Sequence, residues 1–206
     1  MNWRIILLVF VAQFALGNED DPSEKRVVLV VVNGKSIDRA GVDLAANIQF
    51  KMWSFRTKNE PSISEAERER MLAGFKEKAV EDLINKRLIL EQFRLAGGTI
   101  NRKYIDSAID QFIEMRFNGN RDSFLQELEK SKISFEEFRK SQEEAIILQA
   151  MSNQKAIGET EAERKRNLEN WLGGLRKKAS IRYHVDSPLA SEGKAEPKPG
   201  KKVRSQ

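Results

Sequence analysis

Residues 26–34 read RVVLVVVNG, an unbroken run of valine and leucine that ends in an Asn-Gly pair. Such a run predicts a short strand that is buried on both faces and is followed by a turn. Beyond it, as far as residue 154, the apolar residues recur at spacings of three and four, which is the periodicity of amphipathic helices. The chain is therefore predicted to be mainly α-helical, with one strand at its start.

Capping residues and glycines predict where the helices begin and end. Asp38 is expected to cap a first helix, and Gly97-Gly98 to end a second, long helix. Asn101 is expected to cap a third helix, and Ser134 with Glu137 forms a capping box for a later one. Short turns join these segments and no fixed repeat period is found, so we expect an interlocked helical domain rather than a solenoid.

A second strand is predicted near the C-terminus, after a last helix at 162–178. Residues 181–185 alternate apolar and polar side chains, which is the pattern of a half-exposed strand. An isolated strand would leave its backbone N–H and C=O groups unpaired. We therefore expect residues 27–32 and 181–185 to pair, forming a small two-stranded sheet from the N-terminal and C-terminal strands.

The two ends of the chain have compositions of their own. Residues 1–17 combine one positive charge, an apolar run and small residues before Gly17, which predicts a signal peptide and hence export. A membrane anchor is the alternative, but the apolar run is shorter than the ~20 residues that a spanning helix needs. Residues 186–206 are rich in Pro, Gly and Lys and predict a disordered basic tail.

The packed domain is accordingly expected to span residues 26–185. Residues 26–155 form its N-terminal core in this prediction, and residues 161–185 form a returning helix and strand. The chain has no cysteine, so no disulfide can form and its stability must come from the apolar core.

Four segments, taken in order, carry a family resemblance: VNGKSI at 32–37, LINKRLIL at 83–90, IDSAI at 105–109 and ISFEEFR at 133–139. Together they resemble the N-terminal chaperone domain of SurA-type periplasmic proteins. Residues 171–179 are similar to the segment that, in this family, returns to the domain after the prolyl isomerase modules. The resemblance implies a helical chaperone domain.

The resemblance also implies that the parvulin isomerase is missing, because only a few residues lie between Gln154 and Glu161 where the family carries one or two such modules. The single histidine, His184, lies on the predicted terminal strand and has no partner motif for general base catalysis. No metal-ligand cluster or Gly-rich phosphate loop is found either. We therefore expect a protein that is not an enzyme and that uses no metal or cofactor.

Binding of unfolded chains calls for adaptable apolar side chains, and Met and aromatic residues supply them. A first group falls within six residues, so its members cannot share one helix face, and some must point into a groove against the returning helix or into solvent. In a second group the helical spacing favours the core. The candidate client-binding residues are Phe50, Met52, Trp53, Phe55, Phe112, Met115, Phe117 and Phe124.

The sequence thus predicts a periplasmic, ATP-independent chaperone (a holdase) that binds unfolded or partly folded envelope proteins through apolar grooves. Outer-membrane precursors are the clients that the resemblance implies. The alternative is a non-catalytic envelope adaptor or structural protein with one specific partner, and a weaker one is a regulatory subunit for a separate isomerase. A chaperone should leave a broad apolar groove, whereas an adaptor should bury its aromatic residues or present one compact patch.

The charge pattern bears on the remaining partners. The 36 basic residues are interleaved with 31 acidic ones, so the net charge of +5 gives no reason to expect nucleic acid binding. The basic tail is a candidate for weak contact with anionic membrane lipids. The short linker at 153–160 leaves open an exchange of the last helix between protomers, and so a homodimer.

Overall fold

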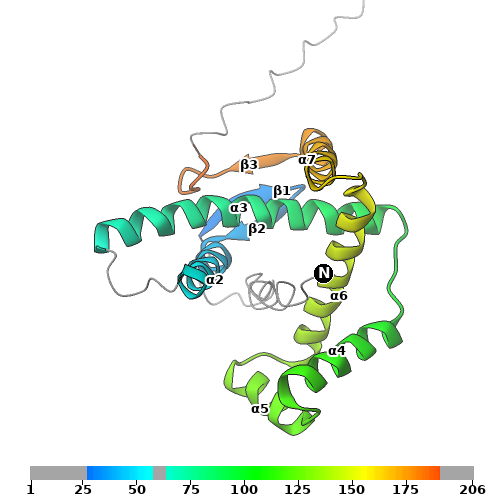
Figure 1. Ribbon diagram of the computed structural model, residues 1–206. Coiled ribbons are helices and arrows are strands. Elements are labelled where there is room, and N and C mark those ends of the chain that lie inside the picture. The colour runs from blue at the N-terminus through cyan, green and yellow to red at the C-terminus, as the bar shows by residue number, and fades with distance from the viewer. Residues whose placement is uncertain (1–26, 58–63, 191–206) are drawn as a thin grey trace, which may run out of the picture.

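The computed structural model describes residues 27–57 and 64–190, and within these the side chains of residues 55–57 are left undescribed. The predicted signal peptide at 1–17 and the part of the predicted tail beyond residue 190 lie outside the described residues. Figure 1 shows the arrangement, and its labels are used here. The described elements are β1 (Val28–Val32), β2 (Lys35–Asp38), α2 (Arg39–Thr57), α3 (Glu65–Leu95), α4 (Arg102–Phe117), α5 (Arg121–Lys130), α6 (Phe135–Lys155), α7 (Glu161–Lys178) and β3 (Ile181–Tyr183).

The described strands form one antiparallel sheet in the order β2-β1-β3. The predicted pairing of the two chain ends is confirmed, because Val31 lies opposite Arg182 in the ladder. The sheet has three strands rather than the expected two, since the chain turns at Asn33-Gly34 and runs back as β2. Both turn residues have positive φ (49° and 82°), as a tight two-residue hairpin requires.

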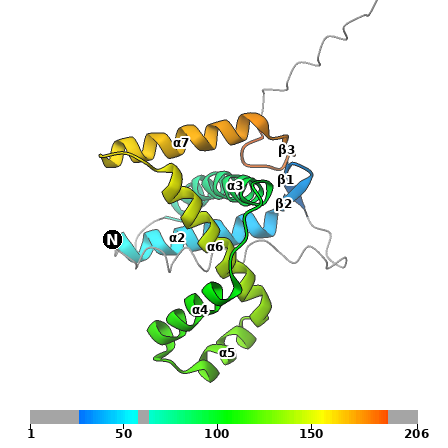
Figure 2. The ribbon, with the colours of Figure 1, turned by 90° about the vertical axis from the view of Figure 1, so that its right-hand side faces the viewer.

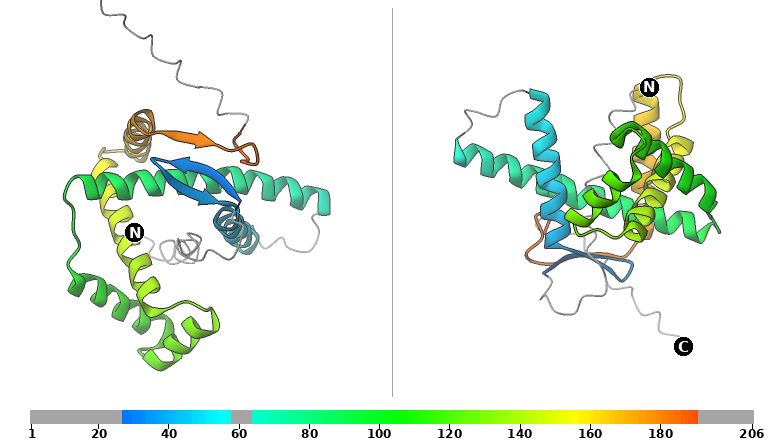
Figure 3. Two further views of the ribbon diagram at one scale, coloured as in Figure 1. Left: turned by 180° about the vertical axis from the view of Figure 1, so that it is seen from behind. Right: turned by 90° about the horizontal axis from the view of Figure 1, so that it is seen from below.

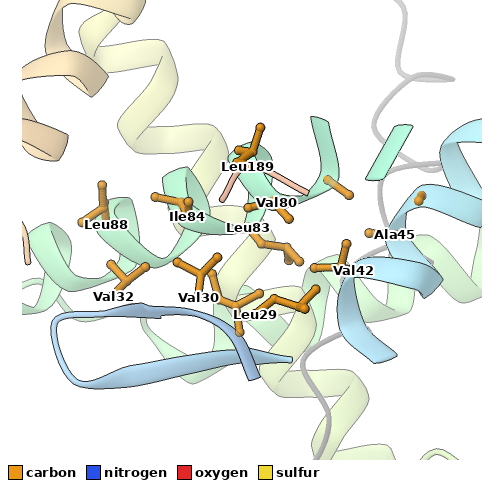
Figure 4. Close-up of a cluster of buried hydrophobic side chains, with 13 residues drawn as sticks. Leu29, Val30, Val32, Val42, Ala45, Val80, Leu83, Ile84, Leu88 and Leu189 are labelled. Atoms are coloured by element: carbon orange, nitrogen blue, oxygen red, sulfur yellow. The ribbon is translucent and has the colours of Figure 1, made fainter. Parts of the chain in front are cut away.

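A first hydrophobic core lies between the sheet, α2 and α3 (Figure 4). The apolar run of β1 supplies the buried residues Leu29, Val30 and Val32, whereas Val28 and Val31 are half-buried, so the predicted burial on both faces is confirmed only in part. Seen from behind (Figure 3), the sheet lies against α3. The sheet, α2 and α3 together are called the first lobe below. Its buried core residues are Leu29, Val30, Val32, Ile37, Val42, Ala45, Ala46, Ala79, Val80, Leu83, Ile84, Leu88 and Leu189.

The packed chain extends further toward the C-terminus than residue 185. Leu189 is only 4% exposed and belongs to the first core, and Ser187 is also buried. Backbone bonds from Ser187 to His184 and from Ala190 to Ser187 fold this stretch into turns. Residues 186–190 therefore belong to the fold and not to the tail in which the composition placed them.

A second hydrophobic core joins α4, α5 and the first half of α6, called the second lobe below. Figure 2 shows this lobe below the rest of the molecule, with α6 leading from it up to α3 and α7. Its buried residues are Ile105, Ile109, Ile113, Phe124, Leu128 and Phe138. The two lobes thus have separate cores, and α6 is the element that connects them.

The predicted helix boundaries are confirmed by the caps. The Gly41 N–H donates to Oδ1 of Asp38 (2.8 Å) at the start of α2, and the Lys103 N–H donates to Oδ1 of Asn101 (2.9 Å) at the start of α4. Ser134 and Glu137 form the expected capping box of α6. Among the described residues, no helix is both long and apolar enough to cross a membrane.

Candidate functional site

The first group of predicted client-binding residues packs against α3. The buried ring of Phe50 meets Phe75 of α3 edge to face, with ring centroids 6.1 Å apart, and lies 5.9 Å from the ring of Trp53. The Arg68 guanidinium covers the Phe50 ring at 5.6 Å. Met52 and Trp53 are half-buried, and the side chain of Phe55 lies outside the described residues. This group stabilises the pairing of α2 with α3, and Phe50 has almost no surface left for a client.

The second predicted group forms part of the core of the second lobe. Phe124 is 1% exposed, and its ring lies 5.0 Å from that of Phe138 and 5.5 Å from that of Phe117. Phe112 and Phe117 are half-buried in the same cluster, 6.0 Å apart. Met115 is exposed. Packing of these rings against each other therefore leaves Phe124 no contact with solvent, while Met115 remains at the surface.

The structure brings a different set of residues together, between the C-terminal ends of α3, α6 and α7. They enclose an open pocket of about 390 Å³. It lies where α7, drawn in orange at the top of Figure 2, passes over α6 and the end of α3. The lining residues are Gln92 and Ala96 from the end of α3, Met151, Gln154 and Lys155 from α6, and Trp171, Gly174, Leu175 and Lys178 from α7.

Side-chain hydrogen bonds hold α7 in place over α3. Nε of Arg176 donates to Oδ1 of Asn85 (2.9 Å), and Nη2 of Arg176 donates to the carbonyl oxygen of Glu81 (3.4 Å). Past the end of α7, the Ser180 N–H donates to Oδ1 of Asn33, and the Asn33 N–H donates to the Ser180 carbonyl oxygen. The sheet thus fixes the C-terminal end of α7. Because α7 forms one wall of the pocket and α3 another, these bonds define the distance between the two walls.

The linker before α7 is fixed as well. Nη1 of Arg164 donates to the carbonyl oxygens of Gly158 and Glu159, and Nδ2 of Asn167 donates to that of Ile157. Thr160 begins α7 with a capping box to Glu163. Hydrogen bonds from the backbone N–H groups of Thr160 and Glu159 to the Glu163 carboxylate lower the pKa of that carboxyl group. The turn from α6 into α7 is therefore a defined structure in the protomer.

Apolar side chains and positive charge surround the pocket. Leu95, next to the lining residue Ala96, is 77% exposed, and Ile157, two residues after Lys155, is 68% exposed. The last turns of the three helices carry basic residues: Arg94 on α3, Lys155 on α6, and Arg176, Lys177 and Lys178 on α7. Each helix end contributes only about half a negative charge from its dipole, so the basic side chains dominate the local potential.

Trp171 and Leu175 lie on the returning helix predicted from the sequence, and neither is among the predicted client-binding residues. The sequence feature that could have drawn attention to these residues is the Gly173-Gly174 pair, which lies inside α7. Glycine is unfavourable inside a helix, so its presence there requires an explanation. An added Cβ at either glycine would meet no atom within 4 Å.

The described residues contain no group of three or more His, Asp or Glu side chains that could hold a metal ion. His184 follows β3, and its backbone N–H donates to the Leu29 carbonyl oxygen, which gives it a place in the sheet. What the described part of the chain offers is an apolar pocket suited to binding.

Comparison with known proteins agrees with this arrangement. The family model described as "SurA-like N-terminal domain" matches residues 2–152. The match covers most of the chain, from before β1 to the last turn of α6, and leaves out α7, β3 and Leu189. No curated protein matches the chain.

Proposed function

Because the chain belongs to the SurA-like N-terminal domain family, a family of chaperone type, we propose that it is a holdase for unfolded or partly folded proteins. In this proposal it binds apolar segments of such proteins without ATP. The proposal places it in the periplasm, with residues 1–17 as its signal peptide, and makes outer-membrane precursors its preferred clients.

The observation that carries the proposal is the pocket between α3, α6 and α7. Trp171, Met151 and Leu175 give it apolar walls, and it is open to solvent. Leu95 and Ile157, which are close in sequence to lining residues, are exposed apolar side chains as well. Exposed apolar surface of this kind marks interaction sites in soluble proteins, because its burial by a partner releases water.

Mass action is sufficient for the proposed mechanism. Occupied pockets lower the concentration of free unfolded chains, and aggregation, which depends steeply on that concentration, slows. No bond is made or broken, so the chain needs no catalytic group.

Aggregation of a diluted, urea-unfolded outer-membrane β-barrel protein provides the test. The purified protein at near-stoichiometric amounts is expected to reduce light scattering, and Trp171→Ala is expected to weaken this effect. Trp53→Ala is the matched control, since Trp53 is a half-buried tryptophan on α2 and does not line the pocket. Absence of suppression with this and with an unrelated unfolded protein would disprove the general holdase function.

A specific observation supports an adaptor as the second candidate function. The pocket is compact, and most aromatic rings of the second lobe pack against one another instead of facing solvent. A compact patch is what a single partner requires. An adaptor would leave aggregation of all unfolded proteins unchanged and would retain one folded protein from an envelope extract, with loss of that protein in Trp171→Ala.

A further inference from the structure

We infer that the pocket between α3, α6 and α7 takes one bulky apolar side chain of a polypeptide whose adjacent residue carries a carboxylate. This inference rests on the proposed binding of polypeptide segments and specifies which segments are bound. Three observations lead to it: the size and lining of the pocket, a glycine that keeps it open, and two lysines that line it.

The size of the pocket limits its occupant. Its volume of about 390 Å³ is near the lower end of the ~300–1,000 Å³ of small-molecule sites. One leucine-sized or aromatic side chain with its backbone fits such a space, whereas a folded element does not. Met151 and Trp171 can adapt to occupants of different shape, because thioether and indole groups offer large, polarisable contact surfaces.

Gly174 keeps the pocket open at a cost to the helix. It lies inside α7, where any residue except proline would favour the helix more. Close packing does not explain the glycine, because an added Cβ would meet no atom within 4 Å. Gly174 lines the pocket, so any side chain at this position would extend into the space that an occupant needs.

The two lysines among the lining residues favour an acidic neighbour of that side chain. Lys155 ends α6 and Lys178 ends α7, so two of the three helices that form the pocket each contribute an ammonium group. Within the described ranges, neither ammonium forms an ion pair. Both charges are therefore available to a carboxylate, while a basic neighbour would be repelled.

In the test, short Gly/Ser peptides are added to the purified protein, and the indole N–H signal of Trp171 is followed by NMR. The probes carry a central Leu-Asp, Ala-Asp, Leu-Asn or Leu-Lys pair. The Leu-Asp peptide is expected to shift the Trp171 signal and to leave the Trp53 indole signal unchanged. The Leu-Asp peptide should bind about tenfold more tightly than the Ala-Asp peptide, because alanine lacks most of the apolar contact that leucine makes. Its affinity should exceed that of the Leu-Asn peptide by about two- to fivefold, the range of an exposed ion pair.

Two pairs of variants separate the pocket from the rest of the surface. Gly174→Leu is expected to weaken binding of the Leu-Asp peptide at least about tenfold, and Gly173→Leu, its neighbour that does not line the pocket, to leave it unchanged. Both variants should melt no lower than the parent protein, because leucine favours a helix more than glycine does. The double variant Lys155→Gln/Lys178→Gln should bind the Leu-Asp and Leu-Asn peptides equally. Lys103→Gln, at an exposed lysine of α4 that does not line the pocket, should keep the difference.

Wild-type affinity in Gly174→Leu, or equal binding of the Leu-Asp and Leu-Lys peptides, would overturn the inference. The aggregation assay on the same variants separates this result from failure of the proposed function. If the wild-type protein and the Gly174→Leu variant suppress aggregation equally and neither binds the peptide, the inference about the pocket is refuted and the holdase function is supported. If the Leu-Asp peptide binds in the pocket but the protein does not suppress aggregation, the inference about the pocket is supported and the holdase function is refuted.

Discussion

Nζ of Lys86 on α3 lies 2.8 Å from Oε2 of Glu144 on α6, and these side chains are only 8% and 12% exposed. Within the described residues the Lys86 ammonium has no well-aligned hydrogen bond, so the attraction of the two charges carries the contact. This ion pair links the first lobe to the helix that connects it with the second lobe.

Removal of one partner is therefore expected to destabilise the protein strongly. Glu144→Ala should lower the free energy of unfolding by about 3 kcal/mol, because it leaves a buried charge unpaired. The double variant Lys86→Met/Glu144→Leu should regain most of this loss, since apolar residues of similar size need no desolvation of charge. Urea denaturation measures both values, and a double variant as unstable as the single one would contradict the prediction.

The aromatic cluster of the second lobe should behave as a core. Phe124→Ala is expected to cost about 3–5 kcal/mol, because a large and fully buried ring is removed from among its neighbours. Met115→Ala, in the same lobe but exposed, should change the free energy of unfolding by less than about 0.5 kcal/mol. Hydrogen exchange of the amides in α4 and α5 localises the effect, and a small loss in Phe124→Ala would show that the rings are not closely packed.

Leu189 should contribute to stability although it lies beyond the last strand. Leu189→Ala is expected to lower the free energy of unfolding by about 2–3 kcal/mol, since the side chain is buried in the first core. Val185 is 94% exposed, so Val185→Ala serves as the control and should be near neutral. Equal stability of the two variants in thermal denaturation would contradict this prediction and show that residues 186–190 are not part of the fold.

The start of α7 should depend on pH through Glu163. Hydrogen bonds from Thr160 and Glu159 lower the pKa of this carboxyl group in the folded protein, so the carboxylate form is the one that stabilises the cap. Its contribution is complete above the unfolded pKa of about 4.3 and is lost as the pH falls through the lower, folded pKa. The protection of the amides in the first turn of α7 against hydrogen exchange, relative to their intrinsic exchange rates, should fall below that pH, and Glu163→Gln should remove this acid dependence. An unchanged acid dependence in Glu163→Gln would assign it to another group.

Local signals in the sequence were sufficient for most of the fold. Asn33-Gly34 predicted the turn, Asn101 and Ser134 predicted helix starts, and the unpaired backbone of two strands predicted their pairing across the chain. β2 was missed because it has only four residues, of which Ile37 alone is buried. Such a strand has no periodicity of its own, and the tight hairpin with β1 is what forms it.

The pocket could not be read from the sequence because its walls come from three helices whose crossing depends on tertiary packing. Composition drew attention to the dense aromatic residues of α2, α4 and α5, and the structure uses Phe50 and Phe124 for packing. Trp171 and Leu175 are spaced as an ordinary apolar helix face. Among the lining residues, only Gly174 contradicts local helix preference, and such a contradiction is where a functional position is expected to stand out.

The hydrogen bonds between Asn33 and Ser180 join residues that are 147 positions apart. Synthesis begins at the N-terminus, so β1 must remain without its β3 partner until residues 181–183 have been made. The pocket, which needs α7, is completed equally late, while α2, α3 and the second lobe need only earlier residues. A newly made molecule that ends at α6 has an incomplete pocket and an unpaired edge on β1, and such an edge can pair with other chains until β3 covers it.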